Sequence, residues 1–367
     1  MGYLSVFLAS AAAAFAATPL VRRLAIRWGA IDRPSDRKVH PQPTPTLGGV
    51  ALWFAVLVGL GVAYLIPSFR GLLDVSSEPL GAALAGTVIV VLGVYDDVRG
   101  MAAPAKVAGQ ILAAGLLILS GVQLFYFWLP GLGILSFSPD VAVPATLLWA
   151  LLMINAVNLI DGLDGLAAGV VVIAAAAFFA YAFRTGEIFP GPSPASLISV
   201  VVAGAAAGFL PHNFHPARIF MGDSGSMLLG LLLAAATISG IGRSVAPTTT
   251  DLAALAIPVI IPLLVLAVPF TDVVLAIVRR LRRGRPVYAP DKQHIHHRLL
   301  EIGHSHRAAV LLMYLWSALL ASAALAITFV RSVELAVGFL VVVGAILLGT
   351  SLPRMLRRGK ARMRPSS

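Results

Sequence analysis

Long apolar runs that carry almost no charged side chain alternate with short polar segments along most of the 367-residue chain. A helix needs about 20 apolar residues to cross the hydrocarbon core of a bilayer, so these runs predict membrane-spanning helices. The pattern predicts an all-α, polytopic integral membrane protein with about eleven transmembrane helices. The predicted spans cover residues 3–21, 47–67, 80–95, 104–124, 141–160, 165–183, 195–211, 224–241, 252–278, 308–330 and 334–353.

Composition supports this class and excludes others. Apolar residues make up 59% of the chain, charged residues make up 12%, and the mean hydropathy is +0.91. A soluble globular chain carries about 25% charged residues, roughly twice this share. The chain contains no cysteine, which excludes disulfides, thiolate metal sites and a cysteine nucleophile.

The basic residues predict the orientation in the membrane. Alternate loops and the C-terminal tail hold 23 of the 27 Lys and Arg residues. The positive-inside rule makes these segments cytoplasmic, with the N-terminus outside and the C-terminus in the cytoplasm. We expect residues 1–353 to form a single transmembrane catalytic domain and residues 354–367 a basic cytoplasmic tail. The net charge of +11 therefore indicates contact with anionic lipid and not with nucleic acid.

Carboxylates gather at the predicted cytoplasmic ends of the spans, in three groups. These are the pair Asp96–Asp97, then Asp161 with Asp164, and then Asp223. A carboxylate at mid-bilayer costs about 2.5–3.5 kcal/mol on insertion scales, so such residues usually serve a function. Their common membrane level predicts one active site on the cytoplasmic face, built from several helix ends.

Asp96 and Asp97 are adjacent at the end of a predicted span, in the stretch LGVYDDVRG. Two neighbouring carboxylates repel each other unless a cation or a donor lies between them. Mg²⁺ suits such a pair, because it binds few carboxylates and keeps positions for water and phosphate oxygens. The alternative is a solvated acidic helix end that pairs with Arg99.

The stretch NAVNLIDGLDGLAAG, residues 155–169, carries four amide and carboxylate side chains at intervals of three. On a helix this spacing keeps them near one face, where they can read the donor–acceptor edge of a base such as uracil. The alternative is a polar contact between helices. The four residues are Asn155, Asn158, Asp161 and Asp164.

Two further segments indicate phosphate chemistry. In HNFHPARIFMGDSGS, residues 212–226, Asp223 leads into a span, so the free N–H groups of a helix N-terminus and a metal-binding carboxylate coincide. A plain N-cap is the alternative. In residues 291–307 a basic, histidine-rich tract suits a diphosphate, with zinc or a solvated loop as alternatives. Its members are His294, His296, His297 and Arg298.

Taken in order, these motifs resemble the polyprenyl-phosphate N-acetylhexosamine-1-phosphate transferase superfamily of bacterial membranes. The resemblance runs over the whole chain, through PTPTLGG at 43–49, DD at 96–97, NAVNLIDGLDGL at 155–166, FMGDSGS at 220–226 and HIHHR at 294–298. It implies eleven helices in the bacterial cytoplasmic membrane, often as a homodimer. It also implies dependence on Mg²⁺, with Mn²⁺ as a substitute.

The resemblance implies a role for each matching residue. Asp96 and Asp97 match the catalytic pair, and Asp223 matches the metal ligand. The nucleotide side is implied for Asn155, Asn158, Asp161, Asp164, Asn213, Phe220, Lys38 and His40. The diphosphate and sugar side is implied for Lys106, His294, His296, His297 and Arg298.

The resemblance implies transfer of N-acetylglucosamine 1-phosphate from UDP-GlcNAc to undecaprenyl or decaprenyl phosphate, with release of UMP. The form HIHHRL at 294–299 is similar to the GlcNAc-1-phosphate branch, whereas the phospho-MurNAc-pentapeptide branch shows three consecutive histidines followed by Phe-Glu. Asp97 is a candidate general base, nucleophile, or positioner of metal or phosphate, and the sequence leaves these open. The alternative functions are transfer from a UDP-MurNAc-pentapeptide or another UDP-N-acetylhexosamine, and secondary transport.

Overall fold

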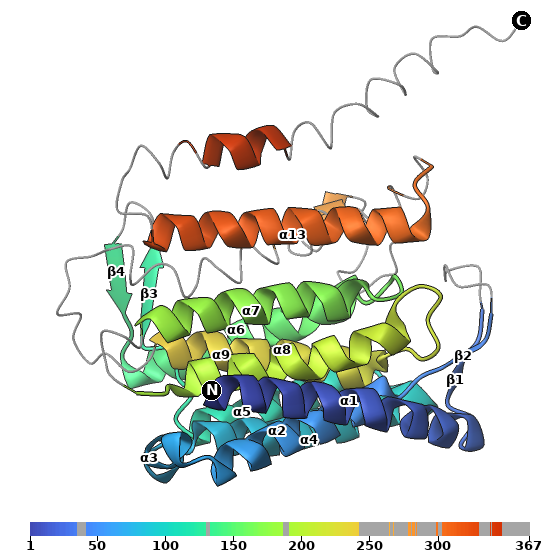
Figure 1. Cartoon of the computed structure of the whole chain (residues 1–367), viewed down its shortest axis with the longest axis horizontal. Helices are drawn as coiled ribbons and strands as arrows, with labels where there is room; N and C mark the ends of the chain where they lie inside the picture. Colours follow the sequence, from blue (N-terminus) through green and yellow to red (C-terminus); the bar gives the residue numbers. More distant parts are fainter. Residues whose placement is uncertain are drawn as a thin grey trace, which may run out of the picture.

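The computed structural model describes residues 1–34, 42–129, 133–185, 191–241 and 303–329, with single positions and short runs elsewhere between 264 and 346. Within these residues the chain forms a bundle of long, roughly parallel helices (Figure 1). The long helices are α1 (Gly2–Arg27), α2 (Gly48–Leu65), α4 (Glu78–Arg99), α5 (Ala103–Leu119), α6 (Pro139–Ile160), α7 (Leu166–Thr185), α8 (Pro194–Asn213), α9 (Gly222–Ile241) and α13 (His306–Phe329).

The bundle confirms a polytopic, predominantly helical membrane protein. Eight of the described helices are long and apolar enough to cross a bilayer, and α5 is a shorter apolar helix of 17 residues. The predicted spans 252–278 and 334–353 lie largely outside the described residues, as does the predicted tail 354–367. The count of eleven spans and their orientation therefore stay predictions.

The all-α prediction missed four short strands, and it did not separate one short helix. Strand β1 (Ile31–Asp32) pairs with β2 (Thr44–Pro45), and β3 (Tyr126–Leu129) pairs with β4 (Gly133–Ser136), both antiparallel. The predicted span 47–67 ends early, because Pro67 begins a separate short helix, α3 (Pro67–Val75). Strands of two to four residues are too short to show an alternating pattern in the sequence.

Helix α9 forms the centre of the bundle. It contacts α2, α4, α6 and α8, and 89% of its spanning segment is buried. In contrast, α1 is an outer helix with 28% of its spanning segment buried, and α13 lies beside α7 on another side (Figure 1). The N-terminus of α9 is therefore surrounded by protein.

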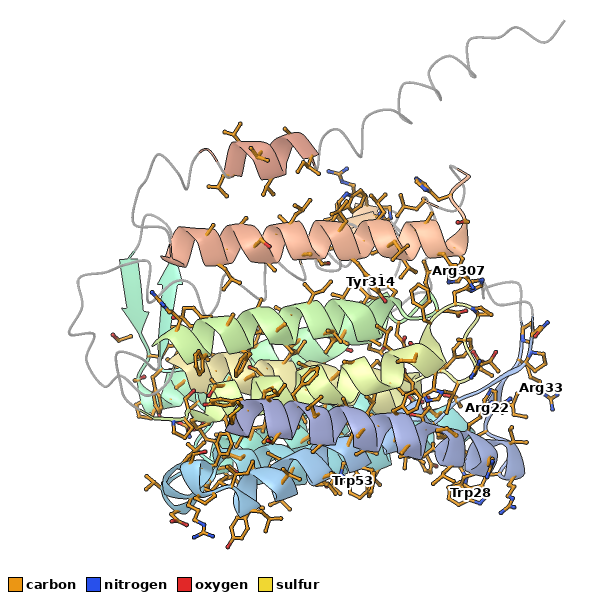
Figure 2. The ribbon with its side chains drawn as sticks, in the orientation of Figure 1. Arg22, Trp28, Arg33, Trp53, Arg307 and Tyr314 are labelled. Atoms are coloured by element: carbon orange, nitrogen blue, oxygen red, sulfur yellow. The ribbon has the colours of Figure 1, made fainter. Side chains whose placement is uncertain are left out.

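The helix ends divide between two ends of the bundle. We call one of them the basic end; it holds the C-termini of α1, α4, α6 and α8 and the N-termini of α2, α5, α7, α9 and α13. Figure 2 shows Arg22, Arg33 and Arg307 at this same end. All the predicted site residues in described segments belong to elements that meet there.

Glycines let three helices approach closely at the basic end. A Cβ atom on Gly49 of α2 would overlap the backbone of Ser224 and Gly225, and one on Gly93 of α4 would overlap Ser224. The first turn of α9 therefore lies directly against α2 and α4. The only residue that fits at such a backbone-to-backbone contact is glycine.

Gly49→Ala should destabilise the protein strongly. The added methyl group has no space against the α9 backbone, and overpacking of this kind typically costs about 1–3 kcal/mol or more. Gly61→Ala, in the same helix, is the matched control, because Gly61 is exposed and has no atom within 4 Å of its Cβ position. The unfolding temperatures of both variants in detergent would test this. Equal unfolding temperatures would contradict the close contact.

Candidate active site

Lys106 is the centre of a polar cluster at the basic end. Its Nζ atom lies 2.9 Å from Oδ2 of Asp96 and 2.6 Å from Oδ2 of Asp223. The other oxygen of Asp223 accepts a hydrogen bond of 2.5 Å from Nδ2 of Asn158, which also contacts Oγ of Ser226 at 2.8 Å. One residue from each of α4, α5 and α6 thus meets the first turn of α9.

Asp97 binds the N-terminus of α9 with both carboxylate oxygens. Oδ1 accepts a hydrogen bond from the backbone N–H of Asp223 at 2.8 Å. Oδ2 accepts from the N–H of Ser224 at 3.2 Å and from its hydroxyl at 2.8 Å. The sequence predicted free N–H groups here for a substrate anion. That prediction is wrong, since a carboxylate of the chain itself fills this place.

Asp161 follows the last residue of α6 and lies beside the cluster. Its carboxylate makes no hydrogen bond within the described part of the chain. Burial raises the pKa of Asp161 well above its usual value, and the negative charges of Asp223, Asp97 and Asp164 raise it further. This carboxylate is therefore held among like charges, and a nearby cation would stabilise its charged form.

The sequence placed Asp161 and Asp164 on one helical face with Asn158, and this placement is wrong. Helix α6 ends at Ile160, and residues 161–165 form a turn that leads into α7. Gly165, at φ +81°, closes the turn in the left-handed region that glycine adopts without strain. The two glycines in this motif interrupt the helix, so the period of three does not continue past residue 160.

Asp164 belongs to a second cluster, with two histidines. Its Oδ2 atom accepts hydrogen bonds from Nδ1 of His215 at 2.7 Å and from the N–H of Ala217 at 3.0 Å. Its own N–H donates to Nε2 of His306 at 3.1 Å, and the rings of His215 and His306 stack with centroids 4.2 Å apart. The ligand atoms of this triad lie within 4.8 Å of one another, close enough to hold a metal ion.

The sequence pattern did not predict His215 and His306 as site residues. His215 lies in the segment 212–226 and His306 in the tract 291–307, but neither has a spacing that distinguishes it from the motif HIHHR at 294–298. Their contacts connect the α8–α9 loop to α13. Arg307 strengthens this connection, because its Nε donates to the carbonyl of His215 at 3.1 Å, and the hydroxyl of Tyr314 donates to the carbonyl of Gly165 (Figure 2).

Asn155 and Asn213 bind other parts of the protein. Asn155 donates to Oε1 of the buried Gln110 at 2.9 Å, which is the contact between helices considered as the alternative. Asn213 is 1% exposed; it accepts from the N–H of Gly165 at 3.2 Å and donates to the carbonyl of Ile219 at 3.0 Å. The backbone of Phe220 pairs with Pro45 and Gly48 at 2.9 and 3.0 Å.

Six predicted site residues lie outside the described residues. They are Lys38, His40, His294, His296, His297 and Arg298.

Comparison with known proteins decides the family. The chain is 42% identical to the decaprenyl-phosphate N-acetylglucosaminephosphotransferase of Mycolicibacterium smegmatis over 96% of this chain and 88% of that protein. Residues 79–241 match the model of the Glycosyl transferase family 4. The chain belongs to the Glycosyl transferase family 4.

Other relatives in this family carry related names. A probable undecaprenyl-phosphate N-acetylglucosaminyl 1-phosphate transferase of Bacillus subtilis is 36% identical over 81% of this chain and 77% of its own length. The undecaprenyl-phosphate alpha-N-acetylglucosaminyl 1-phosphate transferase of Yersinia pestis is 30% identical over 99% of this chain and 95% of its own length.

Negative charge exceeds positive charge around the Lys106 cluster of this Glycosyl transferase family 4 protein. The ammonium group of Lys106 pairs with Asp96 and Asp223, and the negative charges of Asp97 and Asp161 lie close to Asp223. A divalent cation would offset the excess negative charge, and Asp161 has a carboxylate without another partner among the described residues. The donor set consists of oxygen atoms, which suits Mg²⁺ or Mn²⁺ better than a softer ion.

Asp97→Asn should reduce stability as well as activity. An Asn side chain has only one oxygen, so one of the N–H groups at the start of α9 faces an NH₂ group that cannot accept. An unsatisfied buried group costs about 1–3 kcal/mol. Asp96→Asn is the control, since the Asp96 carboxylate binds the side chains of Lys106 and Asp223 and not the backbone N–H groups of α9. Thermal unfolding of both variants would test this, and an unchanged unfolding temperature for an inactive Asp97→Asn would indicate a purely chemical role.

Proposed function

We propose that this protein transfers N-acetylglucosamine 1-phosphate from UDP-GlcNAc to a polyprenyl phosphate, releasing UMP and forming polyprenyl-diphospho-N-acetylglucosamine. The observation that carries the proposal is the cluster of Asp96, Lys106, Asn158 and Asp223, formed by the helix ends that carry the family motifs. The names of the relatives at 36–42% identity give the sugar and the lipid.

The reaction joins two anions, and this determines what the site must supply. An oxygen of the lipid phosphate attacks the β-phosphorus of the UDP-sugar, the bond to the α-phosphate oxygen breaks, and UMP leaves. A phosphate monoester has a second pKa near 6, so the lipid phosphate is already largely dianionic at neutral pH. Positive charge and correct positioning are therefore needed more than a strong base.

Lys106 and a bound Mg²⁺ supply this positive charge in our proposal. Lys106 is held between Asp96 and Asp223, which fixes its ammonium group at the centre of the site. Asp223 and Asp161 would hold the Mg²⁺, which when bound offsets the charge of the diphosphate. Asp97 positions α9, and through it Asp223, and does not itself accept a proton.

The nucleotide side of the site is proposed beside the α6–α7 turn. Phe220, which lies two residues before α9 begins, has a partly buried ring. An aromatic ring can stack on a base, while an amide or carboxylate reads its edge. Asn213 supports the turn from behind by binding Gly165. The residues 294–298 are proposed to bind the diphosphate and the sugar.

Several finer points belong to the proposal as well. The positive-inside rule favours a cytoplasmic location for the basic end and hence for the site. The form HIHHRL favours N-acetylglucosamine over a MurNAc-pentapeptide. Decaprenyl and undecaprenyl phosphate both fit, because an apolar groove discriminates weakly between lengths of an apolar chain. Dimerisation stays a prediction.

Asp161→Asn should make the metal-free protein more stable and the enzyme less active. Removing this charge relieves the cost of burying it and the repulsion from Asp223 and Asp97. The same change removes a metal ligand, so Mg²⁺ should raise the unfolding temperature of the wild type more than that of the variant. Thermal unfolding with EDTA and with Mg²⁺ measures both effects. A variant that is less stable in EDTA would argue against the repulsion.

Asp223→Asn should abolish transfer. The test incubates purified protein with UDP-GlcNAc, polyprenyl phosphate and Mg²⁺, and measures UMP and the lipid product. We expect a loss of at least about a hundredfold, as for other groups that act on the transition state. Asp74→Asn is the matched control, since Asp74 is exposed on α3 at the other end of the bundle.

Three outcomes would contradict the proposed function. UMP release that is unaffected by Asp223→Asn would place the chemistry elsewhere. Faster release from UDP-MurNAc-pentapeptide than from UDP-GlcNAc would replace the donor. Movement of the sugar nucleotide across liposomes without UMP release would indicate the transporter alternative.

A further inference from the structure

A small basic cavity lies at the basic end, between the last turns of α1 and the α8–α9 loop. It has a volume of about 160 Å³. Its lining includes the guanidinium-bearing residues Arg22 and Arg23 of α1, Arg218 of the loop, and His212 at the end of α8. No Asp or Glu belongs to this lining among the described residues. The cavity is distinct from the Lys106 cluster, with which it shares no residue.

The arginines are placed by the fold. Nε of Arg22 donates a hydrogen bond of 3.0 Å to the carbonyl of Arg218, which joins α1 to the α8–α9 loop. Nε2 of His212 lies 3.1 Å from the carbonyl of Phe15. Within the described part of the chain, no ion pair with a carboxylate is formed by Arg22, Arg23 or Arg218. The cavity therefore has a surplus of positive charge, which suits an anion.

An exposed apolar stripe of α1 leads to this cavity. Leu4, Leu8 and Phe15 are each more than half exposed, and their spacing of four and seven puts them on one face of the helix. Pro19 and Arg22 continue the same face at four and seven residues beyond Phe15. The Phe15 ring also contacts the His212 ring, at a centroid distance of 4.8 Å.

We propose that this cavity binds the phosphate headgroup of an anionic membrane phospholipid, with an acyl chain along the apolar face of α1. Arg22, Arg23 and Arg218 bind the phosphate, and Leu4, Leu8 and Phe15 contact the chain. Basic pockets between transmembrane helices at the cytoplasmic side commonly bind such headgroups. Phe15 lies about 10 Å along the helix from Arg22, which matches a headgroup at the interface and a chain in the hydrocarbon layer. Binding of this phospholipid would not depend on the UDP-sugar or the polyprenyl phosphate of the proposed function.

The test measures which lipids remain bound to the purified full chain. The protein is reconstituted in nanodiscs of equal parts phosphatidylglycerol and phosphatidylcholine, released into mild detergent and analysed by native mass spectrometry. We expect the wild-type protein to retain phosphatidylglycerol in preference to phosphatidylcholine. The double variant Arg22→Gln, Arg23→Gln should lose this preference by about thirtyfold, since each removed arginine is worth roughly 1 kcal/mol near an anionic headgroup.

Matched controls separate the cavity from general surface charge. The double variant Arg27→Gln, Arg33→Gln removes the same charge at the same end of the molecule, and neither residue lines the cavity. It should keep the preference for phosphatidylglycerol. Arg218→Gln removes the third guanidinium from a different segment and should weaken retention too. If the Arg22, Arg23 variant does not fold, the Arg218 variant and the wild-type preference decide the question.

Four outcomes would overturn the proposal. They are equal retention of both phospholipids by the wild type, an equal loss in the Arg27, Arg33 control, displacement of the lipid by millimolar inorganic phosphate, and retention of added polyprenyl phosphate in place of phosphatidylglycerol. The third would indicate a site for free phosphate, and the fourth a path for the lipid substrate.

Discussion

The interaction on which the basic end of the bundle depends is the contact of the Asp97 carboxylate with the N-terminus of α9. A helix N-terminus carries partial positive charge and unpaired N–H groups, and in a buried helix both must be compensated by protein. Asp97 compensates both, with hydrogen bonds to Asp223 and Ser224. Gly93 lies one turn earlier in α4 and permits the close approach. Asp223 therefore has a fixed position relative to Lys106 and Asn158 before any ligand binds.

This arrangement stores repulsion at the same place. Four aspartates meet near one lysine, and burial strengthens the repulsion that raises the pKa of Asp161. The apolar bundle can tolerate this, because α9 and its neighbours contribute extensive packing away from the site. A site that must bind a diphosphate, a lipid phosphate and a cation gains from such imbalance, since each ligand that enters relieves part of it. The repulsion that lowers the stability of the ligand-free protein thus increases the free energy of ligand binding.

The sequence predicted most long helices and the residues that gather at the site. The length of an apolar run and the position of carboxylates at its end can both be read directly from the order of residues. It did not predict which groups bind each other. The partners of Asp97 come from α9, more than a hundred residues away, and only the close packing of Gly93 and Gly49 brings them together. Asp161 and Asp164 were misplaced because helix α6 ends at Ile160, before either residue. The histidine triad depends on the contact of α13 with α7, which no local pattern encodes.

The α8–α9 loop also depends on contacts between distant segments, because most of its residues bind a different part of the protein. The N–H of Ala217 binds Asp164, the carbonyl of Arg218 binds Arg22 of α1, and the carbonyl of Ile219 binds Asn213. Phe220 then pairs with Pro45 and Gly48. Such a loop cannot shift at one contact without straining the others, so it acts as a rigid platform between the outer helix α1 and the first turn of α9. A lipid bound at Arg218 and a substrate bound near Asp223 would contact two sides of one rigid segment, which the protein itself already holds in position for both.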